Sequence, residues 1–193
     1  MFNRYRLTLV FGFTLGVGLS HGASAQVAQR WSADAGVGAA AVNGGGFLNT
    51  GRAAARLSVA DRMLQRGRFA MYAEAGYEWL GEFGLLGGNA DLVCVVDRAG
   101  GGCRPPYPYV TGPSASIGLA YAPFARAETR VGVGGAGYSV NGTRVGAAVG
   151  QLDAAVFPAA HLGLILGARL AVIPQYRHER LSMVPVLLGV RVQ

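Results

Sequence analysis

The chain has 193 residues, a formal net charge of +7, 51% hydrophobic residues and only 14% charged residues. This length predicts a single domain and excludes a large multidomain enzyme, while so apolar a composition excludes a disordered chain, and the charged fraction is far below the roughly 25% of soluble domains. After the N-terminal segment no run of 18 or more apolar residues follows, so a bundle of transmembrane helices is excluded as well.

The first 25 residues have the three parts of a secretory signal peptide. Arg4 and Arg6 form a basic start, Leu7–Leu19 is apolar, and Ala23-Ser24-Ala25 provides small residues for cleavage. As a helix, that apolar stretch would rise only about 20 Å, which is too short to anchor a membrane protein. We therefore expect residues 1–25 to be a signal peptide and residues 26–193 to be one exported domain.

All of the positive charge is arginine, since the chain contains no lysine. Nucleic-acid binding needs basic residues gathered on one face, but only Arg62, Arg66 and Arg68 are clustered here. We therefore expect no nucleic-acid partner.

From Trp31 onward apolar and small or polar residues alternate with a period of two, which predicts β-strands. Alternation identifies eight segments: Trp31–Val42, Ala53–Ala60, Phe69–Trp79, Ala115–Tyr121, Ala127–Val140, Arg144–Val156, Leu162–Val172 and Met183–Val192. The pattern is weakest in Arg144–Val156, where the apolar positions change parity near Gly150, and we expect a β-bulge there.

The connections between these segments alternate in character. Compact segments at Asp61–Arg68, Ala122–Arg126 and Phe157–Ala160 join strands at one end, and the remaining connections fall at the other end: Asn43–Gly51, Gly81–Pro113, Asn141–Thr143 and Pro174–Arg180. Such an order is that of an antiparallel meander, in which Asn141-Gly142 forms a tight hairpin turn.

The longest connection, Gly81–Pro113, contains the only two cysteines, Cys94 and Cys103. In an exported chain two cysteines with this spacing favour a disulfide, with two free thiols as the alternative.

The composition of the polar face indicates where that face lies. A soluble barrel would carry many charged residues on it, whereas here it is mostly Gly, Ala and Ser, as suits a narrow lumen, and the apolar face then meets lipid. We expect the few charged residues of this face to form a salt-bridge network across the lumen, in which Tyr72 provides a phenol: Asp34, Arg56, Glu74, Glu78, Glu128, Arg130, Asp153, Arg169 and Arg191.

Aromatic residues of the apolar face fall near the two ends of the strands. Trp31, Phe69 and Tyr121 lie near the compact turns, and Tyr77 and Trp79 lie near the longer loops. Amphipathic rings favour the headgroup level of a membrane, so we expect these residues to form two aromatic girdles.

The signal peptide, the eight alternating segments and the unequal connections resemble the small outer-membrane β-barrels of the OmpX and OmpA transmembrane type. The resemblance implies an all-β, eight-stranded, antiparallel up-and-down barrel in the outer membrane, monomeric and embedded in lipid. It implies a structural or surface-interaction role, with a lumen too small for porin conductance and with loop 81–113 available to an extracellular partner. One departure is the ending Val190-Arg191-Val192-Gln193, which lacks the terminal aromatic residue usual in such barrels.

No motif of the chain predicts a cofactor or a metal site. The glycine pattern from Gly132 to Gly137 resembles a dinucleotide fingerprint but lies inside a predicted strand with no helix after it. His161 and His178 are far apart in sequence, and the cysteines lack zinc-site spacing.

Two alternatives remain open. One is a lipid-A-modifying barrel enzyme, which would need a histidine next to a serine and an acid, and the other is a soluble periplasmic carrier of the lipocalin type.

Overall fold

The computed structural model describes residues 30–45, 51–81, 95–96, 103–104 and 108–193. Its strands are β1 (Trp31–Gly44), β2 (Gly51–Arg66), β3 (Phe69–Leu80), β4 (Val95–Val96), β5 (Cys103–Arg104), β6 (Val110–Phe124), β7 (Ala127–Val140), β8 (Thr143–Ala159), β9 (Leu162–Tyr176) and β10 (Glu179–Val192). None of the described segments is a helix long and apolar enough to cross a membrane. The predicted signal peptide lies outside the described residues.

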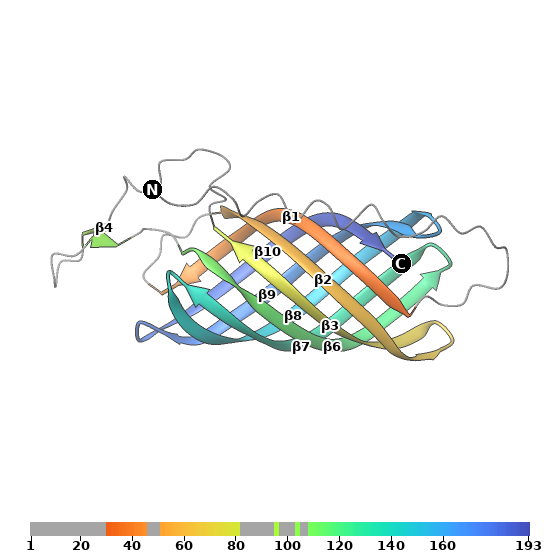
Figure 1. Ribbon diagram of the computed structural model, residues 1–193, viewed down its shortest axis with the longest axis horizontal. Helices are drawn as coiled ribbons and strands as arrows, with labels where there is room; N and C mark the ends of the chain where they lie inside the picture. Colours follow the sequence, from red (N-terminus) through yellow and green to blue (C-terminus); the bar gives the residue numbers. More distant parts are fainter. Residues whose placement is uncertain (1–29, 46–50, 82–94, 97–102, 105–107) are drawn as a thin grey trace, which may run out of the picture.

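Eight of these strands close into one barrel, in the order β1-β10-β9-β8-β7-β6-β3-β2. All eight pairings are antiparallel, including that of β1 with β10, and the strands are strongly inclined to the long axis (Figure 1). The predicted all-β, up-and-down barrel is confirmed. β4 and β5 form a separate two-stranded ribbon within the connection between β3 and β6.

The two ends of the barrel differ in their connections. What we call the turn end carries the short β2–β3, β6–β7 and β8–β9 connections together with the start of β1 and the finish of β10. What we call the loop end carries the other connections, of which the longest joins β3 to β6 through residues 81–109. This alternation of connections along the chain is that of an antiparallel meander, as the sequence predicts.

Apolar side chains of the strands face outward. In β9, Leu164 and Leu166 are 57% and 58% exposed, whereas the intervening Ile165 and the following Arg169 are 8% and 3% exposed. Because successive strand residues point to opposite sides, this single alternation makes an apolar outer wall and sends charged residues to the interior. The assignment of faces from the sequence agrees with this arrangement.

Several strands are longer than the alternation predicts. β2 continues to Arg66 through most of the segment predicted as a turn, and β6 begins at Val110, inside the predicted loop. Register shifts between Arg62 and Leu64 and between Tyr121 and Phe124 let the pairing continue after the alternation is lost. A β-bulge of this kind breaks the period of two without ending the strand.

The predicted bulge near Gly150 is wrong. β8 pairs with β7 without a register shift from Val140↔Thr143 to Ala127↔Val156. Val145, Ala147 and Val149 instead face the interior, in the same parity as Gln151. The apolar residues therefore change side because the interior itself is apolar at that height.

An apolar cluster fills the interior toward the loop end. Its fully or almost fully buried members come from every strand of the barrel and include Ala40, Ala54, Leu80, Val110, Val140, Val149, Ile173, Leu181 and Met183. Sequence analysis places small and charged residues in the lumen and did not predict this cluster.

The β7–β8 hairpin contains the predicted Asn-Gly turn. Asn141 and Gly142 have φ angles of 48° and 86°, as a type I′ turn requires at both central positions. We expect Gly142→Ala to lower the free energy of unfolding by about 1–2 kcal/mol, because an L-residue is strained in the left-handed region. Denaturant unfolding in lipid vesicles measures this change. Gly146→Ala, at a position with open space and no positive φ, is the control and should cost less.

The predicted disulfide stays a prediction. Cys94 lies outside the described residues, and of Cys103 only the backbone is described, where it pairs with Val96 in the β4–β5 ribbon.

Candidate functional site in the barrel interior

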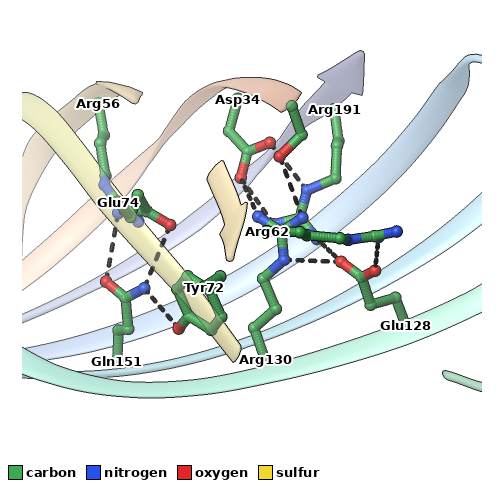
Figure 2. Close-up of polar contacts among 10 residues, drawn as sticks. Asp34, Arg56, Arg62, Tyr72, Glu74, Glu128, Arg130, Gln151 and Arg191 are labelled. Carbon is green, nitrogen blue, oxygen red and sulfur yellow. Dashed lines mark hydrogen bonds and ion pairs between the residues drawn. The ribbon is translucent and has the colours of Figure 1, made fainter. Parts of the chain in front are cut away.

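All nine charged residues predicted for the lumen lie in the interior, and none has more than 8% of its surface exposed. They come from seven strands, because each strand contributes only the inward half of its residues. The side chains form three groups along the axis, and Figure 2 shows two of them.

The first group lies near the turn end and centres on Arg191. Its guanidinium donates to both carboxylate oxygens of Asp34, at 2.8 and 2.6 Å, and to Oε1 of Glu128 at 2.8 Å. Arg130 donates from Nε to the same Glu128 oxygen at 2.6 Å and from Nη2 to Oγ of Ser32 at 3.0 Å. Arg191 and Arg130 are completely buried, so their charges are neutralised by these carboxylates rather than by water.

Arg62 belongs to this group, although sequence analysis did not assign it to the lumen. It donates to Glu128, so that this carboxylate accepts from three guanidinium groups (Figure 2). The inward parity of Arg56, Ser58 and Ala60 in β2 continues to Arg62 and could have identified it. With Arg62 included, the ion-paired groups and Asp153 together contain five guanidinium groups and five carboxylates.

The second group lies in the middle of the barrel. Arg56 forms an ion pair with Glu74 and donates to the Oε1 atom of Gln151 at 3.2 Å. The amide nitrogen of Gln151 donates to Glu74 at 3.2 Å and to the hydroxyl of Tyr72 at 3.0 Å. Gln151 thereby links β2 and β3 to β8 across the bore (Figure 2).

The third group lies closer to the apolar cluster. Glu78 forms an ion pair with Arg169 and accepts a 2.7 Å hydrogen bond from the hydroxyl of Tyr138. Arg169 also donates to Oγ of Ser114 at 3.3 Å. The polar interior thus ends where the apolar cluster, which includes Tyr138, begins.

Asp153 is the one predicted lumen residue for which the described residues provide no ion pair. It is 3% exposed, and its Oδ2 atom has no hydrogen-bond partner among them. A Cβ atom at Gly167 would lie 2.4 Å from its Oδ1 atom, so the absence of a side chain at Gly167 makes the room for this carboxylate.

Two other glycines make room for Tyr72. A Cβ atom would lie 2.5 Å from the Tyr72 hydroxyl at Gly132 and 2.7 Å from it at Gly118. Gly132 is the first glycine of the pattern that resembles a dinucleotide fingerprint, and it lies within β7. Its role here is to accommodate a buried phenol.

The predicted girdle residues lie on the outer face. Phe69 and Tyr121 are direct register partners whose rings stack with centroids 4.8 Å apart, next to the turn end. Trp31 is 57% exposed near the same end, while Tyr77 and Trp79 lie in the loop half of β3 with centroids 4.7 Å apart.

Among the described residues no group of three or more His, Cys, Asp or Glu side chains could hold a metal ion. His161 and His178 lie in the β8–β9 and β9–β10 connections, which are at opposite ends of the barrel. The buried carboxylates other than Asp153 form ion pairs with arginines.

Comparison with solved structures supports the barrel fold described above. No protein-family model matches the sequence, and no curated protein matches it at a significant level. Among solved structures, Neisserial surface protein A is 11% identical, with a TM-score of 0.52 over 84% of this chain and 96% of that one. The fold is that of a small outer-membrane β-barrel. Ail of Yersinia pestis (10% identity, TM-score 0.48, 83% of this chain and 97% of that one) and the outer-membrane enzyme PagL (12%, 0.48, 83% and 99%) are also similar.

The outer wall of this small outer-membrane barrel agrees with that fold. Large apolar side chains stay exposed on all eight strands of the ring, among them Val37, Leu57, Met71, Ile117, Val133, Leu152, Leu166 and Leu188. A continuous apolar wall of this extent is unfavourable in water and is what a bilayer requires. The fold and this wall together make the chain an outer-membrane protein.

Proposed function

We propose that the protein is a non-porin barrel that holds its extracellular loops as a rigid scaffold for surface interaction. The observation that supports this proposal best is that side chains fill the bore in both halves of the barrel. Arg130 and Arg191 are completely buried at the turn half, and Val110, Val140, Leu181 and Met183 are completely buried at the loop half. Eight strands leave an interior that side chains just fill, whereas open channels need more strands.

The closed ring also favours a monomer. β1 and β10 pair with each other over twelve register positions, so the barrel has no free edge strand to which another chain could add. Contacts with a partner then fall to the loops, of which the one between β3 and β6 is the longest.

Conductance in planar bilayers tests the closed bore. The refolded protein should give no stable conductance steps under conditions in which a sixteen-stranded porin does. Regular steps would contradict a filled lumen.

A change in the mass of lipid A when cells express the protein would contradict the non-enzymatic role.

Loop replacement tests the surface role. Replacing residues 82–107 by a short Gly-Ser linker should leave the heat-modifiable mobility of the barrel intact and abolish binding of expressing cells to host-cell or matrix surfaces. Replacing Arg177 and His178 of the β9–β10 turn by Asn-Gly serves as the matched control, since both positions have positive φ angles. Equal binding with and without residues 82–107 would contradict the proposal.

A further inference from the structure

A groove on the outer wall lies close to the loop end. It has a volume of about 660 Å³ and is lined by residues of β3, β6, β7 and β8, including Tyr77, Thr111, Gly137, Ser139, Arg144 and Gly146. The proposed role in surface interaction does not use this groove, since it faces the membrane rather than the medium.

The strand register aligns a row of four outward-facing residues near the loop end, and three of them, Thr111, Ser139 and Arg144, line this groove. Trp79 is paired with Thr111, Thr111 with Ser139, and Ser139 with Arg144, so the row runs across β3, β6, β7 and β8. Arg144 is exposed and forms no ion pair with any residue that the structure describes. The groove therefore combines one available cation with two hydroxyl groups, and Trp79 lies beside it at the end of the row.

The floor of the groove on β7 and β8 consists of small residues, whereas Tyr77 and Pro113 line its side on β3 and β6. Gly137 is paired with Gly146, and a Cβ atom at either position would meet nothing within 4 Å. The small residues continue toward the turn end with Ala75, Ala115, Gly135 and Ala148, and Ala75 and Ala115 also line a second hollow of about 600 Å³. The opposite wall is different, since it presents paired leucines such as Leu166 and Leu188.

We propose that this groove binds one phosphorylated glycolipid of the outer leaflet. Its phosphate contacts Arg144, the hydroxyls of Thr111 and Ser139 contact the sugar headgroup, and an acyl chain lies on the small-residue floor. Arginine is suited to phosphate because its planar guanidinium can donate two parallel hydrogen bonds. The inference rests on the outer-membrane location and on the loop end being extracellular, but not on binding through the loops.

A second copy of the chain fits the groove less well. Two copies in one membrane have the same orientation, so a two-fold dimer through this face would set one concave wall against another and leave the space between them empty. An anionic lipid neutralises the arginine and fills the floor.

The headgroup should contribute most of the specificity. An acyl chain leaves lipid to bind this wall, so it gains packing contacts but no hydrophobic transfer energy. Removing the charge of Arg144 should therefore weaken binding more than filling the floor does.

Native mass spectrometry of the refolded protein in detergent, titrated with bisphosphorylated lipid A, tests the proposal. Arg144→Gln should weaken binding about tenfold, the loss expected for one charge-assisted contact. Gly146→Val should weaken it by a smaller factor. Arg180→Gln, at an exposed position near the start of β10, and Ala35→Val, on the outer face of β1, are the matched controls and should bind as the wild type does.

Four results would overturn the proposal: unchanged binding by Arg144→Gln, equal binding of dephosphorylated lipid A, equal binding of phosphatidylglycerol, or a cross-linked dimer that Gly146→Val abolishes. Heat-modifiable gel mobility checks that each variant is folded. A folded, non-conducting barrel that fails to bind lipid A would overturn this inference and leave the proposed function standing.

Discussion

Glu128→Gln is expected to lower the free energy of unfolding by about 3–5 kcal/mol, which is the usual cost of removing one partner from a buried ion pair. The neutral amide keeps the shape of the side chain but loses the charge that balances Arg62, Arg130 and Arg191. Arg130 and Arg191 are completely buried, so water cannot replace the lost carboxylate. Equilibrium unfolding of the refolded barrel in lipid vesicles measures this loss.

Asp61→Asn is the matched control for that experiment. Asp61 accepts two hydrogen bonds from Arg30, at 2.8 and 3.1 Å, but the Arg30 side chain is 68% exposed. An exposed pair of this kind contributes little to stability, because water screens the charges and the side chains lose entropy when they pair. If both substitutions cost the same, the interior network does not stabilise the barrel.

Leu166→Arg is expected to destabilise the barrel by about 2–4 kcal/mol in vesicles, the cost of a charged side chain on the lipid face near the middle of the bilayer. Leu166 lies in the apolar wall between Ala154 of β8 and Leu188 of β10, and 58% of its surface is exposed. The same unfolding measurement tests this prediction. Because the Leu166 side chain points outward, replacing it removes no contact inside the barrel.

Gln175→Arg provides the comparison, because Gln175 is an exposed residue of the same strand near the loop end. A charge at the membrane interface should cost about 0–1 kcal/mol. Gly163→Arg is a poor control, since a Cβ atom there would lie 2.7 Å from the Phe157 ring. Equal stability of Leu166→Arg and the wild type would mean that this wall does not face lipid.

The sequence predicts the strands and their faces because alternation is a local property. Leu164, Leu166 and Arg169 can be assigned to sides by parity alone. Parity does not show whether the interior is polar or apolar at a given height. The sequence therefore predicts that the apolar residues Val145, Ala147 and Val149 face outward and that a bulge follows them. Their true surroundings depend on which strands meet at the loop end, which is a property of the closed ring.

The same limit applies to the ion pairs. Residue type and parity place Asp34, Glu128 and Arg191 in the lumen, but their contacts depend on the stagger between strands. Arg62 was missed because the register shift after it lies in a segment predicted as a turn. The Trp79–Thr111–Ser139–Arg144 row likewise exists only once three registers are known.

The contact between Asp34 and Arg191 joins residues 157 positions apart, from the first and last strands of the barrel. During synthesis and insertion, Asp34 and Glu128 are present long before their shared counterion arrives with β10. An unfinished sheet therefore contains Asp34 without the two hydrogen bonds from Arg191, whereas Glu128 can already pair with Arg62 and Arg130. Closure of the ring and completion of its central ion-pair network are thus a single late event.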